Sequence, residues 1–119
     1  MRVLIVQSNE ELGNVWCRHL MRLHADVSVV STGSAALIAL QDQQFDVIVL
    51  DLVLEEGSAL AVADFASYRQ PDARVIFVTN TTFFSDGSIF AHSHNACAYV
   101  QSDAPPEDLV AIVDHYGRA

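Results

Sequence analysis

Short apolar runs alternate with longer stretches of helical periodicity along the whole chain. The runs that predict strands are residues 3–6, 27–30, 47–50, 75–78 and 98–100. The third and fourth runs are apolar throughout, which is typical of strands buried on both faces of a sheet. Because expected strands and helices alternate, the pattern predicts repeated βα units and therefore an α/β fold with a parallel sheet.

Polar residues and prolines mark the boundaries of the expected helices. These helices begin at Asn9, within 31–34, at Ser58, around 88–92 and after residues 105–106. The segment at 88–92 has the weakest helical pattern of the five. Pro71 prevents the third helix from continuing, because proline lacks the N–H group and clashes with the preceding turn.

Composition and charge restrict the kind of protein that this chain can be. With 119 residues, of which 51% are hydrophobic and 18% charged, the chain can build one core. We expect a single domain over residues 1–119 without an output domain, because the last expected helix ends close to Ala119. The formal net charge of -9 argues against nucleic acid and anionic membranes as partners, since both require a cationic surface.

Two further features indicate the cellular compartment. Cys17 and Cys97 are the only cysteines, and we expect free thiols in a reducing cytosol rather than a disulfide. The first apolar run turns polar at Gln7, which is too short for a signal peptide or a spanning helix. The sequence therefore predicts a soluble, cytoplasmic protein.

Asp51 is the residue that most clearly requires a chemical explanation. It ends the apolar run 47–50, and a carboxylate at the end of a buried strand is usually paired, bound to metal or used in chemistry. Ligands of open parallel sheets bind at the carboxyl ends of the strands, where Gln7, Ser8, Thr79 and Ser102 are expected to converge with Asp51. The simpler interpretation is that Asp51 caps the following turn.

The sequence resembles the CheY-like receiver domain of two-component response regulators over its whole length. Residues 46–52 are similar to the phosphoacceptor strand of that family, and 54–60 to the loop that follows it. Thr79 ends a run similar to the fourth strand, Tyr99 lies in one similar to the fifth, and residues 106–109 follow at matching spacing. The resemblance implies a flavodoxin-like, doubly wound sheet of five strands in the order 2-1-3-4-5 with five helices.

The family resemblance also implies a function. Asp51 would accept a phosphoryl group from a histidine kinase or phosphotransfer protein, while Thr79 and Tyr99 would relay the change to a downstream signalling protein. The resemblance implies no independent catalytic constellation, so we expect no enzyme activity beyond accepting phosphate. It also allows a homodimer through the last helices.

Three positions of the expected pocket depart from the family pattern. Gln7 and Ser8 stand where the family has an acidic pair that helps to hold a metal ion, and Ser102 stands where it has a lysine. No change of alignment restores that lysine, because all six basic residues are arginines. Phosphoryl transfer requires charge stabilisation, so this pocket is expected to be impaired.

Any magnesium site here should be weak, and the sequence implies no certain cofactor. Mg²⁺ in such sites is held by one or two carboxylates, of which Asp51 alone is expected in the pocket. We place Glu10, Glu55 and Glu56 on the solvated rim. Ser102 can give a phosphate one neutral hydrogen bond, about half as strong as one from a charged group.

Three interpretations therefore stay open. The first is a receiver in which Asp51 is phosphorylated despite the altered pocket. The second is a pseudo-receiver that binds partner proteins without phosphorylation. The third is a flavodoxin-like carrier of a small molecule at the same edge, which the acidic loop at 7–10 disfavours.

Overall fold

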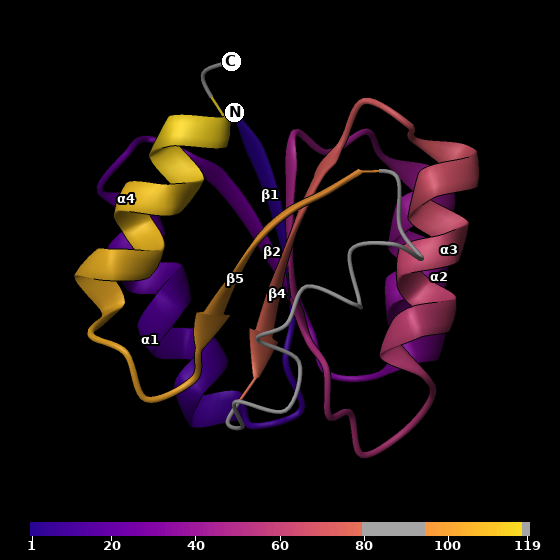
Figure 1. The fold of residues 1–119 in the computed structure, drawn as a ribbon, viewed down its shortest axis with the longest axis horizontal. Coiled ribbons are helices and arrows are strands. Elements are labelled where there is room, and N and C mark those ends of the chain that lie inside the picture. The colour runs from indigo at the N-terminus through magenta and orange to yellow at the C-terminus, as the bar shows by residue number, and fades with distance from the viewer. Residues whose placement is uncertain (80–94, 118–119) are drawn as a thin grey trace.

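Five parallel strands form one sheet that lies between two layers of helices (Figure 1). The computed structural model describes residues 1–79 and 95–117. The strands are β1 (Arg2–Val6), β2 (Asp26–Val30), β3 (Val47–Asp51), β4 (Arg74–Thr79) and β5 (Ala96–Gln101). Their order is β2-β1-β3-β4-β5, and every neighbouring pair is parallel. The flavodoxin-like order expected from the family resemblance is confirmed.

Four helices occur in the described part of the chain. They are α1 (Glu10–Met21), α2 (Gly33–Asp42), α3 (Ala59–Arg69) and α4 (Pro106–Gly117). The remaining expected helix, around 88–92, lies outside the described residues. Within the described ranges, none of the helices has the length and apolar character needed to cross a bilayer.

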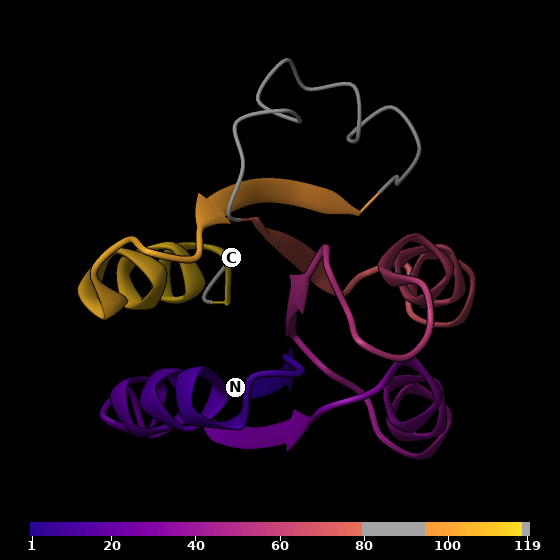
Figure 2. The ribbon, with the colours of Figure 1, turned by 90° about the horizontal axis from the view of Figure 1, so that it is seen from below.

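The helices cover the two faces of the sheet in pairs. Figure 2 shows α1 and α4 together on one face and α2 and α3 on the other. Side chains alternate between these faces along each strand, so Leu4 and Val6 pack toward α2 and α3 while Val3 and Ile5 pack toward α1 and α4. All four of these side chains are fully buried. The continuous burial of β3 and β4 is what their unbroken apolar runs predict.

The helix starts follow the polar residues that mark them in the sequence. Asn9, Thr32 and Ser58 are the N-caps of α1, α2 and α3. Each side chain accepts a hydrogen bond from the backbone N–H three residues later, which satisfies one of the unpaired donors of the first turn. Helix α3 ends at Arg69, shortly before Pro71, as expected.

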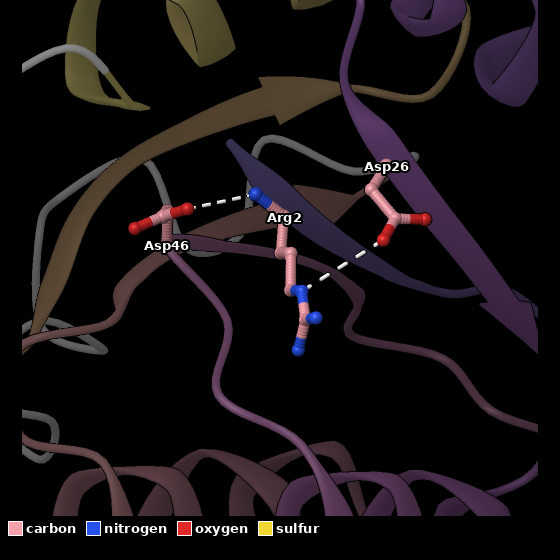
Figure 3. Close-up of polar contacts among 3 residues, drawn as sticks. All are labelled: Arg2, Asp26 and Asp46. Carbon is pink, nitrogen blue, oxygen red and sulfur yellow. Dashed lines mark hydrogen bonds and ion pairs between the residues drawn. The ribbon is translucent and has the colours of Figure 1, made fainter.

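At the amino ends of the strands, three residues form a small polar cluster (Figure 3). The backbone N–H of Arg2 donates to Asp46 Oδ2 at 2.7 Å, and Arg2 Nε lies 3.7 Å from Asp26 Oδ2. The ion-paired side chains are 53% and 74% exposed. Water screens such a pair, so it adds little to stability.

Candidate functional site

The register of the sheet brings two residues together at the carboxyl ends of the strands. Ile5 of β1 pairs with Val49 of β3, so Gln7 and Asp51 occupy the next positions on the same face. That face is the one covered by α1 and α4. Alternation along β5 points Ser102 toward the same side.

These residues line a small cleft. Its volume is about 200 Å³, and the described residues that line it are Gln7, Asn9, Leu12, Asp51, Val53 and Ser102. The structure thus places Gln7, Asp51 and Ser102 in one cleft, whereas Ser8, Thr79 and Tyr99 are not part of its lining. Asp51 is the one acid among the described residues that line it.

Larger hollows occur elsewhere in the described part of the chain. One of about 400 Å³ lies near the amino ends of the strands, between Asp46, Arg74 and Asn95 among others. Another of about 620 Å³ lies on the outer surface of α1. Both lie away from the convergent strand ends where ligands of parallel sheets bind. The smaller cleft around Asp51 is therefore the better candidate site.

Both oxygens of the Asp51 carboxylate accept hydrogen bonds. Gln7 Nε2 donates to Asp51 Oδ2 at 2.6 Å, and the Val53 backbone N–H donates to Asp51 Oδ1 at 2.8 Å. Both distances are short, as is typical of donors to a charged acceptor. The bond from Val53 is also the turn cap that the simpler interpretation of Asp51 predicts. Asp51 therefore caps its turn and still faces the cleft.

The orientation of the Gln7 amide is fixed by its second partner. The Asn9 backbone N–H donates to Gln7 Oε1 at 3.0 Å. Because a backbone N–H only donates, the atom that faces it must be the amide oxygen, and the amide nitrogen then faces Asp51. Gln7 is only 3% exposed. The side chain is thus a buried, fully oriented donor to the carboxylate.

Ser8 has a structural role that its sequence position does not reveal. Its Oγ donates to the carbonyl of Ser31 and accepts from the backbone N–H of Glu55, each at 3.0 Å. One hydroxyl thereby joins the loops after β1, β2 and β3. The sequence carries no signal for this contact, because it depends on the paths of three loops.

The loop after β3 is held by a close approach to α2. Gly57 has a φ of 91°, and a Cβ atom placed on it would lie 3.0 Å from Gly33 Cα. The Gly33 N–H donates to the carbonyl of Glu56 at 2.9 Å. Glycine is required at position 57 because other residues rarely adopt that backbone conformation. This contact fixes the loop that carries Val53 and Glu55.

Comparisons with known proteins identify the fold. No protein-family model and no curated protein matches the chain. A CheY-like response regulator receiver domain from Methanospirillum hungatei is similar in structure, with a TM-score of 0.89 and 19% identity over 98% of this chain and 93% of the other. The chain has the CheY-like receiver fold.

Further receiver structures agree. The N-terminal domain of a response regulator/sensory box/GGDEF protein from Carboxydothermus hydrogenoformans matches with a TM-score of 0.87 and 23% identity, over 99% of this chain and 94% of that one. A response regulator from Burkholderia pseudomallei, solved with a phosphorylated aspartic acid, a calcium ion and citrate, matches with a TM-score of 0.82 and 24% identity. That match covers 92% of this chain and 64% of the other.

On the receiver fold, Thr79 and Tyr99 lie on the opposite face of the sheet from Asp51. Tyr99 pairs with Phe77, so Thr79, two residues after Phe77, points to the same side as Tyr99. Thr79 is 1% exposed, and Tyr99 packs against the core beneath α2 and α3. The backbone N–H of Ser102 donates to the carbonyl of Thr79 at 2.8 Å, which links the end of β5 to that of β4.

The acids near the cleft do not form a metal site. Glu10, Glu55 and Glu56 are exposed, and none of them lines the cleft. Within residues 1–79 and 95–117, no group of three or more His, Cys, Asp or Glu side chains could hold a metal ion. Mg²⁺ needs several oxygen ligands, yet Asp51 is met here by an amide N–H and the oxygen of Gln7 is already used. The described residues around Asp51 therefore do not fit a divalent cation.

Proposed function

We propose that this protein is a receiver module of two-component signal transduction in which Asp51 accepts the phosphoryl group. The observation that carries the proposal is the position of Asp51 at the carboxyl end of the central strand β3, facing the cleft of a receiver fold. The Burkholderia pseudomallei response regulator, which shares the fold, carries a phosphorylated aspartic acid. The phosphoryl donor would be a histidine kinase or a phosphotransfer protein.

The proposed step is a displacement at phosphorus. An oxygen of the Asp51 carboxylate attacks the phosphorus of a phosphohistidine, forming an O–P bond as the P–N bond breaks. The imidazole leaves with that electron pair and takes a proton from solvent. Negative charge on the transferring phosphoryl oxygens must be stabilised. Ser102, which lines the cleft, would supply a neutral donor here, so we expect transfer to be slow.

The proposed response uses Thr79 and Tyr99. Their shared face on neighbouring strands supports a coupled movement of the two side chains when Asp51 changes its charge and hydrogen bonds. Tyr99 packs beneath α2 and α3 and is partly exposed, so its movement would alter the surface around β5. A downstream protein would read that surface. The net charge of -9 favours a partner with a basic face.

A second candidate function is favoured by one contact. Gln7 Nε2 and the Val53 N–H already engage both oxygens of Asp51. A carboxylate held in this way can serve as a structural element, so the domain would bind partners without phosphorylation, as a pseudo-receiver. In that case Asp51→Asn would leave partner binding unchanged.

Intact-mass analysis separates the two functions. The protein is incubated with acetyl phosphate or with a phosphorylated histidine kinase, and its mass is measured against time. We expect a phosphate-sized adduct in the wild type that is absent from Asp51→Asn. Asp46→Asn is the matched control, because Asp46 is an exposed acid directly before β3, at the opposite end of that strand from Asp51.

The absence of an adduct with every donor would contradict phosphorylation and support the pseudo-receiver. An adduct that persists in Asp51→Asn but is lost in Asp46→Asn would show that the site is elsewhere. Native mass spectrometry of the same sample tests the small-molecule carrier, which requires a bound ligand in the purified protein.

A further inference from the structure

We infer that the carboxamide of Gln7 takes over the role of a divalent cation beside Asp51, so that this receiver pocket operates without metal. Gln7 is in this view a positioning residue, which holds the carboxylate by a neutral hydrogen bond. The inference deepens the proposed function and rests on it for the role of Asp51. The inference is argued from the hydrogen-bond donors and acceptors around the buried amide of Gln7.

The first argument is that the amide and a cation require the same oxygen. Gln7 Nε2 lies 2.6 Å from Asp51 Oδ2 and approaches it with an N–H group. An amide nitrogen has no lone pair to offer a metal ion. A cation bound to Oδ2 from the side of Gln7 would have to displace this donor.

The second argument is that the amide cannot simply turn over. Rotation by half a turn would place Oε1 against the Asp51 carboxylate and the NH₂ group against the N–H of Asn9. Both new contacts would be repulsive, between two acceptors and between two donors. Gln7 is also buried, so a swing out of the site would break both bonds without giving the side chain free access to water.

The third argument concerns the neighbouring residue. Ser8 stands beside Gln7 at the second position that an acidic pair would occupy, and its hydroxyl is already used as donor and as acceptor. A carboxylate at this position could not donate to the carbonyl of Ser31. Both positions are thus committed to hydrogen bonds within the protein, so neither side chain is free to serve as a metal ligand.

Metal titration of Gln7 variants tests the inference. Isothermal titration with Mg²⁺ and Mn²⁺ should show no saturable binding to the wild type at millimolar concentrations. Gln7→Glu places a second carboxylate beside Asp51, and we expect it to show saturable binding within that concentration range, because Mg²⁺ in such sites is held by one or two carboxylates. The gain should disappear in Gln7→Glu/Asp51→Asn.

The chain offers a matched control for this substitution. Gln70 is also 3% exposed, and its amide donates to the carbonyls of Leu40 and Gln43 rather than to an acid. Gln70→Glu therefore buries a new carboxylate without creating a pair of acids. Mg²⁺ should raise the unfolding temperature of Gln7→Glu and leave that of Gln70→Glu unchanged. Gln7→Met, which removes the donor without adding charge, should gain no metal binding.

A nuclear magnetic resonance measurement on the wild type reads the contact directly. The side-chain NH₂ signals of Gln7, identified by their loss in Gln7→Met, should be unaffected by Mg²⁺ and should shift in Asp51→Asn. This readout needs no variant at position 7 to bind metal, so it remains decisive if Gln7→Glu fails to fold.

Two results would overturn the inference. One is saturable Mg²⁺ binding to the wild type, accompanied by a shift of the Gln7 amide signals, which would show that the side chain moves aside for the ion. The other is a folded Gln7→Glu protein with no gain in affinity. Neither measurement uses a phosphodonor, so a failure of Asp51 to accept phosphate would contradict the proposed function and leave this result standing.

Discussion

Gln7 and Gln70 are two buried glutamines with the same exposure but different partners. Each side chain is 3% exposed, and each Oε1 accepts one backbone N–H. Gln70 Nε2 donates to the carbonyls of Leu40 and Gln43, at 2.8 Å and 2.6 Å. Gln7 Nε2 donates instead to the carboxylate of Asp51. The same amide thus joins backbone to backbone in one place and backbone to an ionisable side chain in the other.

The difference shows how a buried amide can become part of a functional site. The partners of Gln70 are peptide groups, which have one chemical state, so that contact can only hold the fold together. The partner of Gln7 is an ionisable carboxylate, which in the proposed function also accepts a phosphoryl group. Phosphorylation of Asp51, as proposed, would alter the acceptor that Gln7 contacts, so this amide would respond to it. The comparison predicts a larger structural role for Gln70 and a more specific one for Gln7.

Gln70→Leu should produce the largest loss of stability. The substitution removes all three hydrogen bonds of the amide and leaves backbone groups of Leu40, Gln43 and Phe45 without that partner. Each unsatisfied buried group costs about 1–3 kcal/mol, so we expect a total loss of at least about 3 kcal/mol. Urea unfolding followed by circular dichroism measures it. A loss below about 1 kcal/mol would show that water replaces the amide.

Gln7→Leu should produce the next largest loss of stability. A hydrogen bond to a charged group contributes about 1.5–3 kcal/mol, and the partly buried position of Asp51 favours the lower end of that range. The matched measurement is a double-mutant cycle with Asp51→Ala in the same urea experiment. We expect the two losses to be clearly non-additive, because both remove the same bond. Additive losses would mean that the bond contributes nothing in solution.

Much of the fold could be predicted from the sequence, because its elements follow from local patterns. Alternating apolar runs predict the five strands, and Asn9, Thr32 and Ser58 lie where the helix starts were expected. Local patterns do not predict the order of the strands. Periodicity predicts only a parallel sheet, whereas the resemblance to receivers implies the order 2-1-3-4-5, which the structure confirms.

The candidate site could be predicted only in part. The placement of Gln7 and Asp51 at the same edge follows from strand ends in a parallel sheet. Their direct hydrogen bond does not, because it depends on the backbone N–H of Asn9 turning the amide. The role of Ser8 depends on loop paths that no local pattern encodes. The sequence allows two roles for Asp51, as a turn cap or as a reactive group, and the structure shows the cap without removing Asp51 from the cleft.

Arg2→Met removes an exposed ion pair, with which the buried hydrogen bonds of both glutamines can be compared. Its side chain pairs with Asp26 at 3.7 Å, and both side chains are more than half exposed (Figure 3). We expect a loss of about 0.5 kcal/mol or less, since solvent screens the pair. The bond from the Arg2 backbone to Asp46 is unaffected by the substitution. Urea unfolding at low and high salt checks this, and a loss comparable to that of Gln7→Leu would contradict the contrast between buried and exposed polar contacts.

Ionisation of Cys97 should have no effect on stability at neutral pH and should reduce it only at high pH. Burial raises the pKa of its thiol from 9.0 to about 11, with Arg74 acting in the opposite direction. The thiol of the unfolded chain therefore ionises first, so the contribution is complete below pH 9 and is lost as the pH rises toward 11. Because the side chain is partly exposed, solvent screening limits the loss to at most about 1 kcal/mol. The free energy of unfolding is measured for Cys17→Ala and for Cys17→Ala/Cys97→Ala. The difference between the two variants should be constant up to pH 9 and should change only above it. A difference that is constant up to pH 11 would show that Cys97, unlike Gln7 and Gln70, is not effectively buried in solution.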